Sequence, residues 1–436
     1  MLALGLISVI SEGVKYCRNG GMIMNRSGWL VNLLFIAGIF VVFFVSATYR
    51  ERDEDVLWSR FVGKTGRDIA YDLALLDDGI VIVGWTSSQR IPYDQNVMMV
   101  KLSKNGKLLW NKELGSTGTE GANCVERTHD DGFIVAAISS SDDDEIPAQF
   151  GGQDVWLLKY DAQGNLLWKR CYGSEAYESV LDLVEDEGYL FVGYTTRMGN
   201  EDVWMVKVDE NGKIVWEGSL GSDGWDSAIA VDKATDGYYV VGLTRPAEIN
   251  SVNGFADMWV LKVSKSGEPV WQKRIGGNDW DQASDVLTTA DGGCLVLGTS
   301  WSEEMSFFGR ADFVLVKLDA SGEIEFQRAY GGEQDDIAQK IIRIQDGYLL
   351  VGTTWSDTVN GVKRQGGSDY LVLKIDENGE VVWVKCLGAL LDDVAYAVFS
   401  DGESYYLAGV SYSRSFALRS RSHGEGDALV LRVKLK

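Results

Sequence analysis

Histidine is almost absent from this sequence, with only His129 and His423 among 436 residues. A histidine-based metal site or a Ser-His-Asp catalytic triad therefore has almost nothing to be built from. The five cysteines include no C-x-x-C pair and so indicate neither a zinc site nor a disulfide framework; we interpret the four beyond residue 50 as isolated buried thiols. G-x-G-x-x-G and P-loop patterns are also lacking. The sequence thus supplies no recognisable catalytic, cofactor-binding or metal-binding residue.

Basic residues are also in short supply. The chain has 41 lysines and arginines against 64 aspartates and glutamates, a formal net charge of −23. The first 50 residues hold four of the basic residues and one of the acids, so the remainder carries 37 against 63, a net charge of −26. A body of this charge repels nucleic acid backbones and anionic membrane surfaces, so we expect no nucleic acid partner.

One long apolar run lies near the N-terminus. Residues 28–46, GWLVNLLFIAGIFVVFFVS, contain no charge and approach the roughly 20 residues that span a bilayer as a helix. We predict a transmembrane anchor over residues 28–47, with residues 1–27 in the cytoplasm because Arg26 precedes the run, and the body outside. The alternative is a signal peptide cleaved near Val45-Ser46-Ala47, which would leave the body secreted or periplasmic.

The first residues of the chain raise a separate expectation about its start. Gly20-Gly21 implies two GGN codons shortly before Met22 and Met24, which resembles a ribosome-binding sequence. We therefore expect translation of the native protein to start at Met24, so that residues 1–27 include a mis-started segment.

A sequence motif of about 20 residues repeats through the rest of the chain. DVWLLKYDAQGNLLWKRCYG (residues 154–173) returns as DVWMVKVDENGKIVWEGSLG (residues 202–221), and each copy predicts a strand, a tight turn and a second strand. The aromatic residue of the second strand recurs about every 54 residues, at Trp58, Trp110, Trp168, Trp216, Trp271, Phe326 and Trp383. A glycine follows each after five residues, and an acid follows five further on, at Asp68, Glu120, Glu178, Asp226, Asp281, Asp336 and Asp393.

Seven copies with offset ends predict a closed ring. The first strand, VLWSRFVG, has no partner before it, and the last, DALVLRV, has none after it. Pairing the two orphans removes two exposed sheet edges. We therefore predict an all-β protein in which residues 53–436 form a seven-bladed β-propeller, closed by its N- and C-terminal strands and preceded by one hydrophobic helix.

The repeat resembles those of quinoprotein-type (PQQ-like) propellers, whose blades end in D-x-x-T-G-x-x-x-W. The match here reads Asp161, Gly164 and Trp168, and it extends at the level of fold over roughly residues 56–434. The resemblance implies a strand order within each blade, from an innermost strand that begins with the acid to an outermost strand with the tryptophan. The vicinal cysteine pair of that family is missing, so we expect no cofactor and no metal.

A lysine or arginine recurs on the third strand of each predicted blade. Because a buried cation needs a partner, we predict structural ion pairs with the acids of the turn between the first two strands. The predicted partners are Asp78, Asp131, Glu187, Asp236, Asp291, Asp346 and Asp401 for Lys101, Lys159, Lys207, Lys262, Lys317, Lys374 and Arg432. The seven acids that begin the first strands would form a ring at one channel mouth, and we interpret that ring as structural.

Function is expected on the face that carries the variable connections, because variable loops on a rigid scaffold are where binding sites usually lie. Six aromatic residues on this face are our ligand-binding candidates: Tyr177, Trp225, Trp280, Trp301, Trp355 and Tyr412. The favoured hypothesis is an exported, membrane-anchored and monomeric binding module for a protein or an extracellular glycan, without catalytic residues. The alternative is a polysaccharide-acting enzyme, a glycoside hydrolase or lyase, that uses carboxylates at the channel mouth.

Overall fold

The computed structural model describes residues 55–87, 95–115, 118–141, 150–197, 199–245, 255–305, 308–416, 420–422 and 426–435. The predicted anchor at residues 28–47 and the segment before it lie outside these ranges. Within them, no helix combines the length and the apolar character that a membrane crossing requires.

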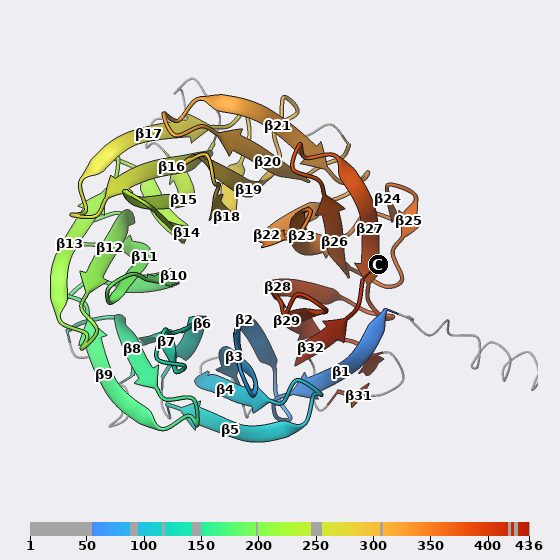
Figure 1. Cartoon of the computed structure of the whole chain (residues 1–436), viewed down its shortest axis with the longest axis horizontal. Helices are drawn as coiled ribbons and strands as arrows, with labels where there is room; N and C mark the ends of the chain where they lie inside the picture. Colours follow the sequence, from blue (N-terminus) through green and yellow to red (C-terminus); the bar gives the residue numbers. More distant parts are fainter. Residues whose placement is uncertain are drawn as a thin grey trace, which may run out of the picture. The chain divides into compact units, whose positions relative to one another are not determined.

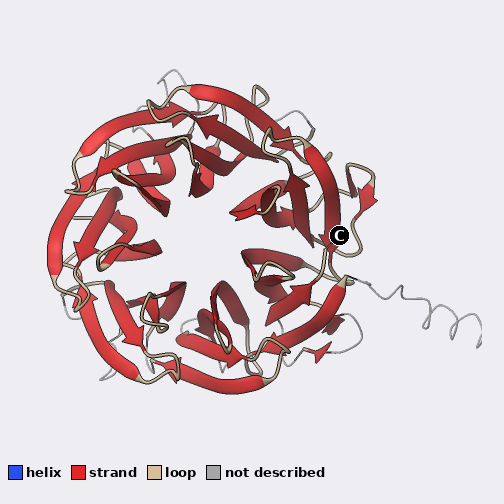
Figure 2. Ribbon diagram, in the orientation of Figure 1, coloured by secondary structure: helices blue, strands red, loops and turns tan. Residues whose placement is uncertain are grey.

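The described strands form seven four-stranded antiparallel sheets arranged around a central axis, which confirms the predicted propeller (Figures 1 and 2). The innermost strands are β2 (Asp68–Leu76), β6 (Glu120–Arg127), β10 (Glu178–Glu185), β14 (Trp225–Ala234), β18 (Asp281–Thr288), β22 (Asp336–Ile344) and β28 (Asp393–Ser400). The second strands are β3 (Gly79–Thr86), β7 (Phe133–Ser139), β11 (Tyr189–Thr195), β15 (Gly237–Arg245), β19 (Cys294–Ser300), β23 (Gly347–Thr354) and β29 (Tyr405–Ser411).

The third strands carry the repeated basic residue: β4 (Asn96–Leu102), β8 (Asp154–Tyr160), β12 (Asp202–Val208), β16 (Asp257–Ser264), β20 (Asp312–Leu318), β26 (Asp369–Ile375) and β32 (Asp427–Val433). The outermost strands are β5 (Leu108–Leu114), β9 (Leu166–Tyr172), β13 (Ile214–Leu220), β17 (Pro269–Ile275), β21 (Ile324–Tyr330), β27 (Val381–Leu387) and β1 (Val56–Val62). Two small hairpins, β24 (Thr358–Val359) with β25 (Val362–Lys363) and β30 (Ser415–Phe416) with β31 (Ser420–Arg421), decorate the ring. We number the blades 1 to 7 by their inner strands, from β2 to β28.

Blade 7 contains both ends of the propeller. Its sheet has the order β1-β32-β29-β28, so the first described strand is paired with the last one. Trp58 lies opposite Arg432 and Val62 opposite Ala428 in this antiparallel ladder. The predicted closure is therefore confirmed, and the first strand of the propeller, β1, lies along β32 as the outermost strand of blade 7 (Figure 1).

The core lies between the blades. Seven apolar clusters occupy the described structure, and each draws its side chains from two adjacent sheets. Strands in the middle of a blade are therefore buried on both faces, and all seven residues of β8 are buried. This explains why the repeated strand is apolar at consecutive positions instead of alternating with polar residues. The thiols of Cys124, Cys294 and Cys386 are free and buried, as expected, whereas that of Cys171 is only partly buried.

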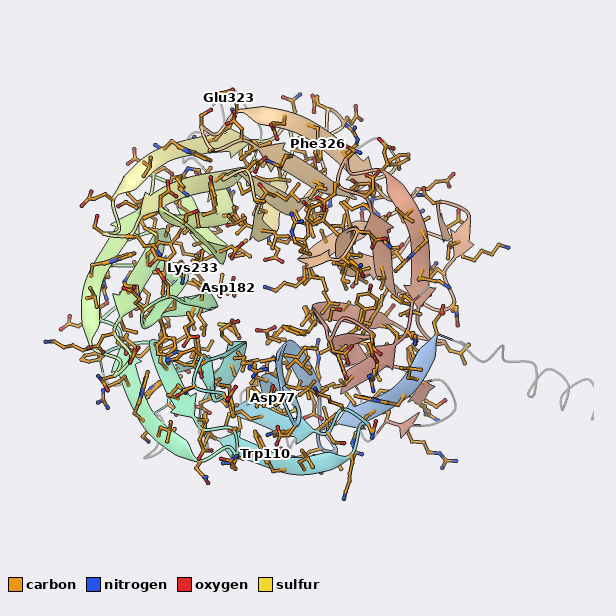
Figure 3. The ribbon with its side chains drawn as sticks, in the orientation of Figure 1. Asp77, Trp110, Asp182, Lys233, Glu323 and Phe326 are labelled. Atoms are coloured by element: carbon orange, nitrogen blue, oxygen red, sulfur yellow. The ribbon has the colours of Figure 1, made fainter. Side chains whose placement is uncertain are left out.

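The tryptophan and the turn glycine of the repeat meet between neighbouring blades. Gly267, in the turn before β17 with a φ of +86°, lies against the indole ring of Trp216 on β13. The Trp216 Nε1–H donates to the carbonyl oxygen of Lys265 in the same turn, at 3.0 Å. Trp110 and Phe326, the latter at the one copy without tryptophan, lie on the outer strands in Figure 3. The turn glycine and the aromatic residue thus recur together because they are in contact between neighbouring blades.

The predicted ion pairs form in five blades at the expected partners. The distances are 2.7 Å for Lys101–Asp78, 2.6 Å for Lys262–Asp236, 2.7 Å for Lys317–Asp291, 2.8 Å for Lys374–Asp346 and 3.2 Å for Arg432–Asp401. The five basic side chains are largely buried, whereas most of the five carboxylates reach solvent. We therefore expect these pairs to fix the register of the strands more than to add net stability.

Two of the predicted partners are wrong. Lys159 pairs with Asp130 at 2.8 Å instead of Asp131, which adopts a left-handed backbone (φ 62°) and pairs with Arg127. Lys207 donates to the backbone carbonyl of Glu187 at 3.1 Å and not to its carboxylate. Glu187 is also left-handed, with φ 46°. A change of backbone conformation in these two turns therefore redirects the side chains.

The contact between turn glycine and tryptophan can be tested with two glycines of equal φ. Gly267→Ala adds a Cβ that would lie 2.7 Å from the Trp216 ring, whereas at Gly402, also at φ +86°, a Cβ meets nothing within 4 Å. Both variants carry the cost of a left-handed alanine, about 1 kcal/mol, but only the first also meets overpacking of about 1–3 kcal/mol. Urea unfolding should show Gly267→Ala to be the less stable variant by that difference. Equal losses in the two variants would show that the indole contact contributes nothing.

Candidate functional site

The seven acids that begin the inner strands are fully buried, each with 0% of its surface exposed. In six blades the carboxylate accepts a hydrogen bond from the backbone N–H four residues earlier, as in Gly277 to Asp281 and Gly332 to Asp336, both at 2.7 Å. Hydroxyl groups add to this, since Ser302 and Ser356 donate to Asp281 and Asp336 at 2.8 Å. The acids therefore brace the junctions between blades, in the arrangement expected of a structural ring.

A second buried acid lies beside the first at most junctions. In six of the seven blades the third strand begins with an aspartate, and in blade 1 Asn96 takes this place. A Cβ on Gly276 would lie 2.2 Å from Asp257 of blade 4 and 2.9 Å from Asp281 of blade 5. The repeated glycine is therefore required because the two carboxyl groups leave no room for a side chain between them.

These carboxyl pairs hold protons more tightly than solvated acids do. Burial raises the pKa of Asp257 to about 6, and the nearby Asp281 adds to the rise. Burial likewise raises the pKa of Asp393 to about 7, against hydrogen bonds that lower it, and Asp369 contributes in the same sense. Two carboxylates this close resist double ionisation, so a pair tends to retain a proton near neutral pH.

The aromatic candidates lie around the channel mouth, where the ladder between first and second strands continues beyond the strand ends. The backbone N–H of Trp301 donates to the carbonyl of Trp280 at 2.9 Å, and Tyr412 and Trp355 donate in the same way within their blades. Tyr177 and Trp225 precede the buried acids of blades 3 and 4. The six candidates thus occupy five consecutive blades, 3 to 7.

Cations already stack on rings at this mouth. The guanidinium of Arg67, next to the buried acid of blade 1, lies 5.7 Å from the ring centroid of Trp85 and 5.5 Å from that of Tyr412. The guanidinium of Arg245 lies 4.9 Å from the centroid of Trp225. All three distances suit cation–π attraction. The mouth therefore presents aromatic faces in positions that a positive group can reach.

Below the mouth, every inner strand has a bulge at the same place. The pairing between first and second strands skips one residue after the third position in all seven blades. A bulge redirects a side chain, and here all seven skipped residues line one cavity of about 330 Å³. They are Tyr71, Asn123, Leu181, Ile229, Ser284, Gln339 and Tyr396.

Charged side chains follow the bulges of four blades. Asp72, Asp182 and Lys340 line the 330 Å³ cavity, and Lys340 Nζ lies 3.6 Å from an oxygen of Asp285. Figure 3 shows Asp182 on the inner side of the ring. Burial acts to lower the pKa of Lys340, but the fields of Asp182, Asp285 and Asp72 outweigh it and raise the pKa well above its ordinary value. The ammonium is therefore charged at any physiological pH.

The electrostatic field at the channel centre is strongly negative despite this lysine. Burial together with the charges of Asp72 and Asp182 raises the pKa of Glu126, two residues beyond Cys124, to about 8. Three carboxylates against one ammonium leave a net charge of about −2 once all of them are ionised. A shift of this kind in a concave site is a physical reason to look for function there.

The copies of the repeat differ from one another at the residues that line this cavity. Counted from the acid, the third to fifth residues of the inner strands read AYD, ANC, VLD, AIA, ASD, AQK and AYA, so the fourth position holds six kinds of residue and the fifth holds four. The seventh position varies at least as much, so sequence variation alone does not mark the bulge. The mouth acids differ from these residues, because six of them make the same carboxylate contact to the backbone.

Comparisons with known proteins agree on fold and go no further. No protein-family model and no curated protein matches the chain. Similar solved structures include Sqt1 from Chaetomium thermophilum, with 12% identity, 88% of this chain and 100% of that chain covered, and a TM-score of 0.47. The WD40 domain of Pan2 from Neurospora crassa has 13% identity over 72% of this chain and 89% of its own, with a TM-score of 0.40.

A third similar structure is a 6-phosphogluconolactonase candidate from Bacteroides uniformis, with 11% identity over 78% of this chain and 93% of that chain and a TM-score of 0.45. At such identities these likenesses concern fold alone and assign no ligand or activity.

The buried carboxyl pairs predict how stability depends on pH. Their native pKa values of about 6 to 7 lie above the roughly 3.9 of an unfolded aspartate, so the native state binds more protons between these values. Stability should therefore fall as pH rises from about 4 to about 7, and thermal melts at pH 5 and pH 8 should show the lower Tm at pH 8.

Asp393→Asn tests one pair directly, because the amide mimics the protonated acid. In this variant, stability should fall less as pH rises from 5 to 8. At pH 8 the free energy of unfolding should exceed that of the parent protein by on the order of 2 kcal/mol. Glu210→Gln, which removes an exposed acid from the turn before β13, is the matched control and should leave the decline unchanged. A Tm that is constant or rises from pH 5 to pH 8 would contradict the assignment of shared protons.

Proposed function

We propose that this chain is a binding module that holds a partner at the mouth of its central channel, on the face of the variable connections. The observation that carries the proposal is that aromatic rings at this mouth reach solvent: two of the six candidates are exposed, and Trp280, Trp301, Trp355 and Tyr412 are partly exposed. Tyr177 is 58% and Trp225 53% exposed, although large aromatic side chains are usually buried in a propeller of this kind. Exposed aromatic rings on a rigid scaffold are typical anchors for a ligand.

Apolar side chains around the mouth extend the proposed surface. Phe150, Phe255 and Phe308 are exposed just before third strands, and Leu390 and Leu391 are exposed in the link before β28. All of these connections open on the same face as the mouth, because neighbouring strands alternate in direction. These exposed apolar groups come from connections of four blades, and a set spread this widely suits a protein partner better than a small molecule.

The alternative of a polysaccharide-acting enzyme is not favoured by the ring acids. A retaining or inverting glycosidase needs two carboxyl groups that reach the scissile bond. Each ring acid has 0% exposure, and six of them hold a backbone N–H of their own blade junction. A glycan bound without catalysis remains an outcome that the experiment below distinguishes.

We also propose that the propeller works outside the cytoplasm as a monomer, anchored by residues 28–47. This part of the proposal is supported by the sequence alone, through the uncharged run and the basic residue before it. The acidity of the body agrees with a role that avoids anionic membrane surfaces.

The proposal is tested by loss of binding in mouth variants. The full chain, purified in mild detergent, is screened on a glycan array and in pull-downs from an envelope extract, and each saturable hit is titrated. Trp225→Ala and Trp301→Ala should each weaken the hit by on the order of tenfold to thirtyfold, because aromatic anchors carry about 2 kcal/mol. Binding to a glycan or to a protein then identifies the class of partner.

Phe399→Ala is the matched control for these variants. Phe399 is a partly exposed aromatic residue near the end of β28, at the opposite end of the inner strand from the mouth. Phe399→Ala should leave the affinity for the hit unchanged. The unfolding midpoints of all variants are compared to show that each one is folded. Hits whose affinity falls equally in Phe399→Ala, or not at all in the two tryptophan variants, would place the binding surface elsewhere.

A further inference from the structure

The channel centre has a charge excess that its own lysine does not balance. Asp72, Asp182 and Asp285 follow the bulges of blades 1, 3 and 5, while Lys340 of blade 6 is the single cation among them. The Lys340 side chain is 28% exposed to the channel and approaches only Asp285 within 4 Å. The other two carboxylates therefore face the cavity without an ammonium of the described residues in direct contact.

These carboxylates are held rigidly in place by the neighbouring blades. Asp72 accepts the backbone N–H of Val125 at 2.9 Å, and Asp182 accepts that of Val231 at 3.0 Å. Each bond leaves lone pairs of the carboxylate available. Carboxylates fixed in this way need no reorganisation to receive a positive group, which favours binding.

A second cavity connects the centre to the mouth. It has about 170 Å³, is lined by Trp301 and Gln282, and shares Ile229, Ser284 and Gln339 with the central cavity of about 330 Å³. Trp301 belongs to the mouth, whereas Asp72 and Asp182 belong to the centre. The two cavities therefore adjoin at the three residues that they share, so a side chain that enters beside Trp301 is directed toward the carboxylates. The volume of the central cavity lies at the low end for small-ligand pockets, about 300–1,000 Å³.

We propose that the channel centre receives a lysine or arginine side chain presented by a protein partner, which enters past Trp301 and places its cationic end between Asp72 and Asp182. This inference rests on the proposed function and adds the chemistry of the ligand. The aromatic rings at the mouth suit the same guest, since Arg67 and Arg245 already stack on three of them. The net charge of −26 on the body would steer a basic partner toward it.

A metal ion fits this site less well than an organic cation. No three His, Cys, Asp or Glu side chains in the described parts of the chain are grouped to hold a metal ion. The ammonium of Lys340 beside Asp285 would also repel a divalent ion. A free amine, for its part, would leave unused the exposed apolar side chains that surround the mouth.

The test compares four fluorescein-labelled peptides of one length, each with a single central arginine, lysine, citrulline or glutamine between identical glycine, serine and phenylalanine flanks. Fluorescence polarisation with the full chain in mild detergent measures each affinity. The arginine and lysine peptides should bind at least about tenfold more tightly than the citrulline and glutamine peptides. Asp182→Asn should remove at least about tenfold from the basic peptides alone, and it can still accept the N–H of Val231.

Lys340→Met separates the proposal from a purely structural role of the carboxylates. If Asp72 and Asp182 only neutralise Lys340, its removal destabilises the fold and gives no gain in affinity. If they form a receptor, removal of the competing ammonium strengthens the arginine peptide by about tenfold. Lys340→Arg retains the positive charge and should change neither the stability of the fold nor the affinity for the arginine peptide. If Lys340→Met does not fold, the affinities of Asp182→Asn distinguish a receptor from a structural role.

Glu210→Gln is the control for loss of one negative charge far from the channel, and it should leave all four affinities unchanged. Equal binding of basic and neutral peptides, or no gain in a folded Lys340→Met, overturns the inference. If the neutral peptides bind as well as the basic ones and Trp225→Ala abolishes both, the mouth is a binding surface and only the cationic ligand is wrong.

Discussion

One backbone hydrogen bond, repeated at every blade junction, sets the geometry on which the rest depends. The N–H of the acid that begins each inner strand donates to the carbonyl of the residue before the third strand of the preceding blade, at 2.8–3.0 Å in all seven junctions. This bond brings two acids side by side at six of the seven junctions, with a glycine beside them, and burial there raises the pKa of acids such as Asp257 and Asp393. The most regular spacing in the sequence, glycine to acid, therefore records a contact between blades.

The same constraint makes the ring a single cooperative object. No blade buries its apolar faces alone, since every core cluster draws on two sheets, and the last junction exists only when β1 has joined β32. Because the ring is held at its junctions, the residues at its axis and at its mouth can differ from blade to blade. Bulges with unlike residues and exposed aromatic rings occur in those two places, where the junction bond is not disturbed.

The sequence was sufficient for the architecture, because architecture is repeated seven times. Blade count and closure followed from Trp58, Arg432 and the spacing between copies, and strand order followed from the resemblance to PQQ-like repeats. Five ion pairs followed as well, while Asp131 and Glu187 failed because a left-handed turn residue cannot be recognised from spacing alone. The six aromatic candidates were predicted on one face, because the connections that carry them alternate with the stereotyped turns of the other face.

The channel centre could not be predicted by counting copies. Lys340 comes from blade 6 and its three carboxylates from blades 1, 3 and 5, so no single repeat contains the cluster. Only the bulge, a break in strand register, turns these residues toward the axis. Sites made by differences between repeats need the closed ring to bring their residues together, which is why the repeat predicted the fold but not the channel centre.

The central claim is that the chain ends close the ring, and hydrogen exchange of the native protein tests it most directly. If β1 is an integral strand of blade 7, the paired amides of Val56–Val62 exchange as slowly as those of Asp427–Val433, both through global unfolding. Rapid exchange over residues 56–62, while the other six blades stay protected, would contradict closure and with it the channel that closure creates.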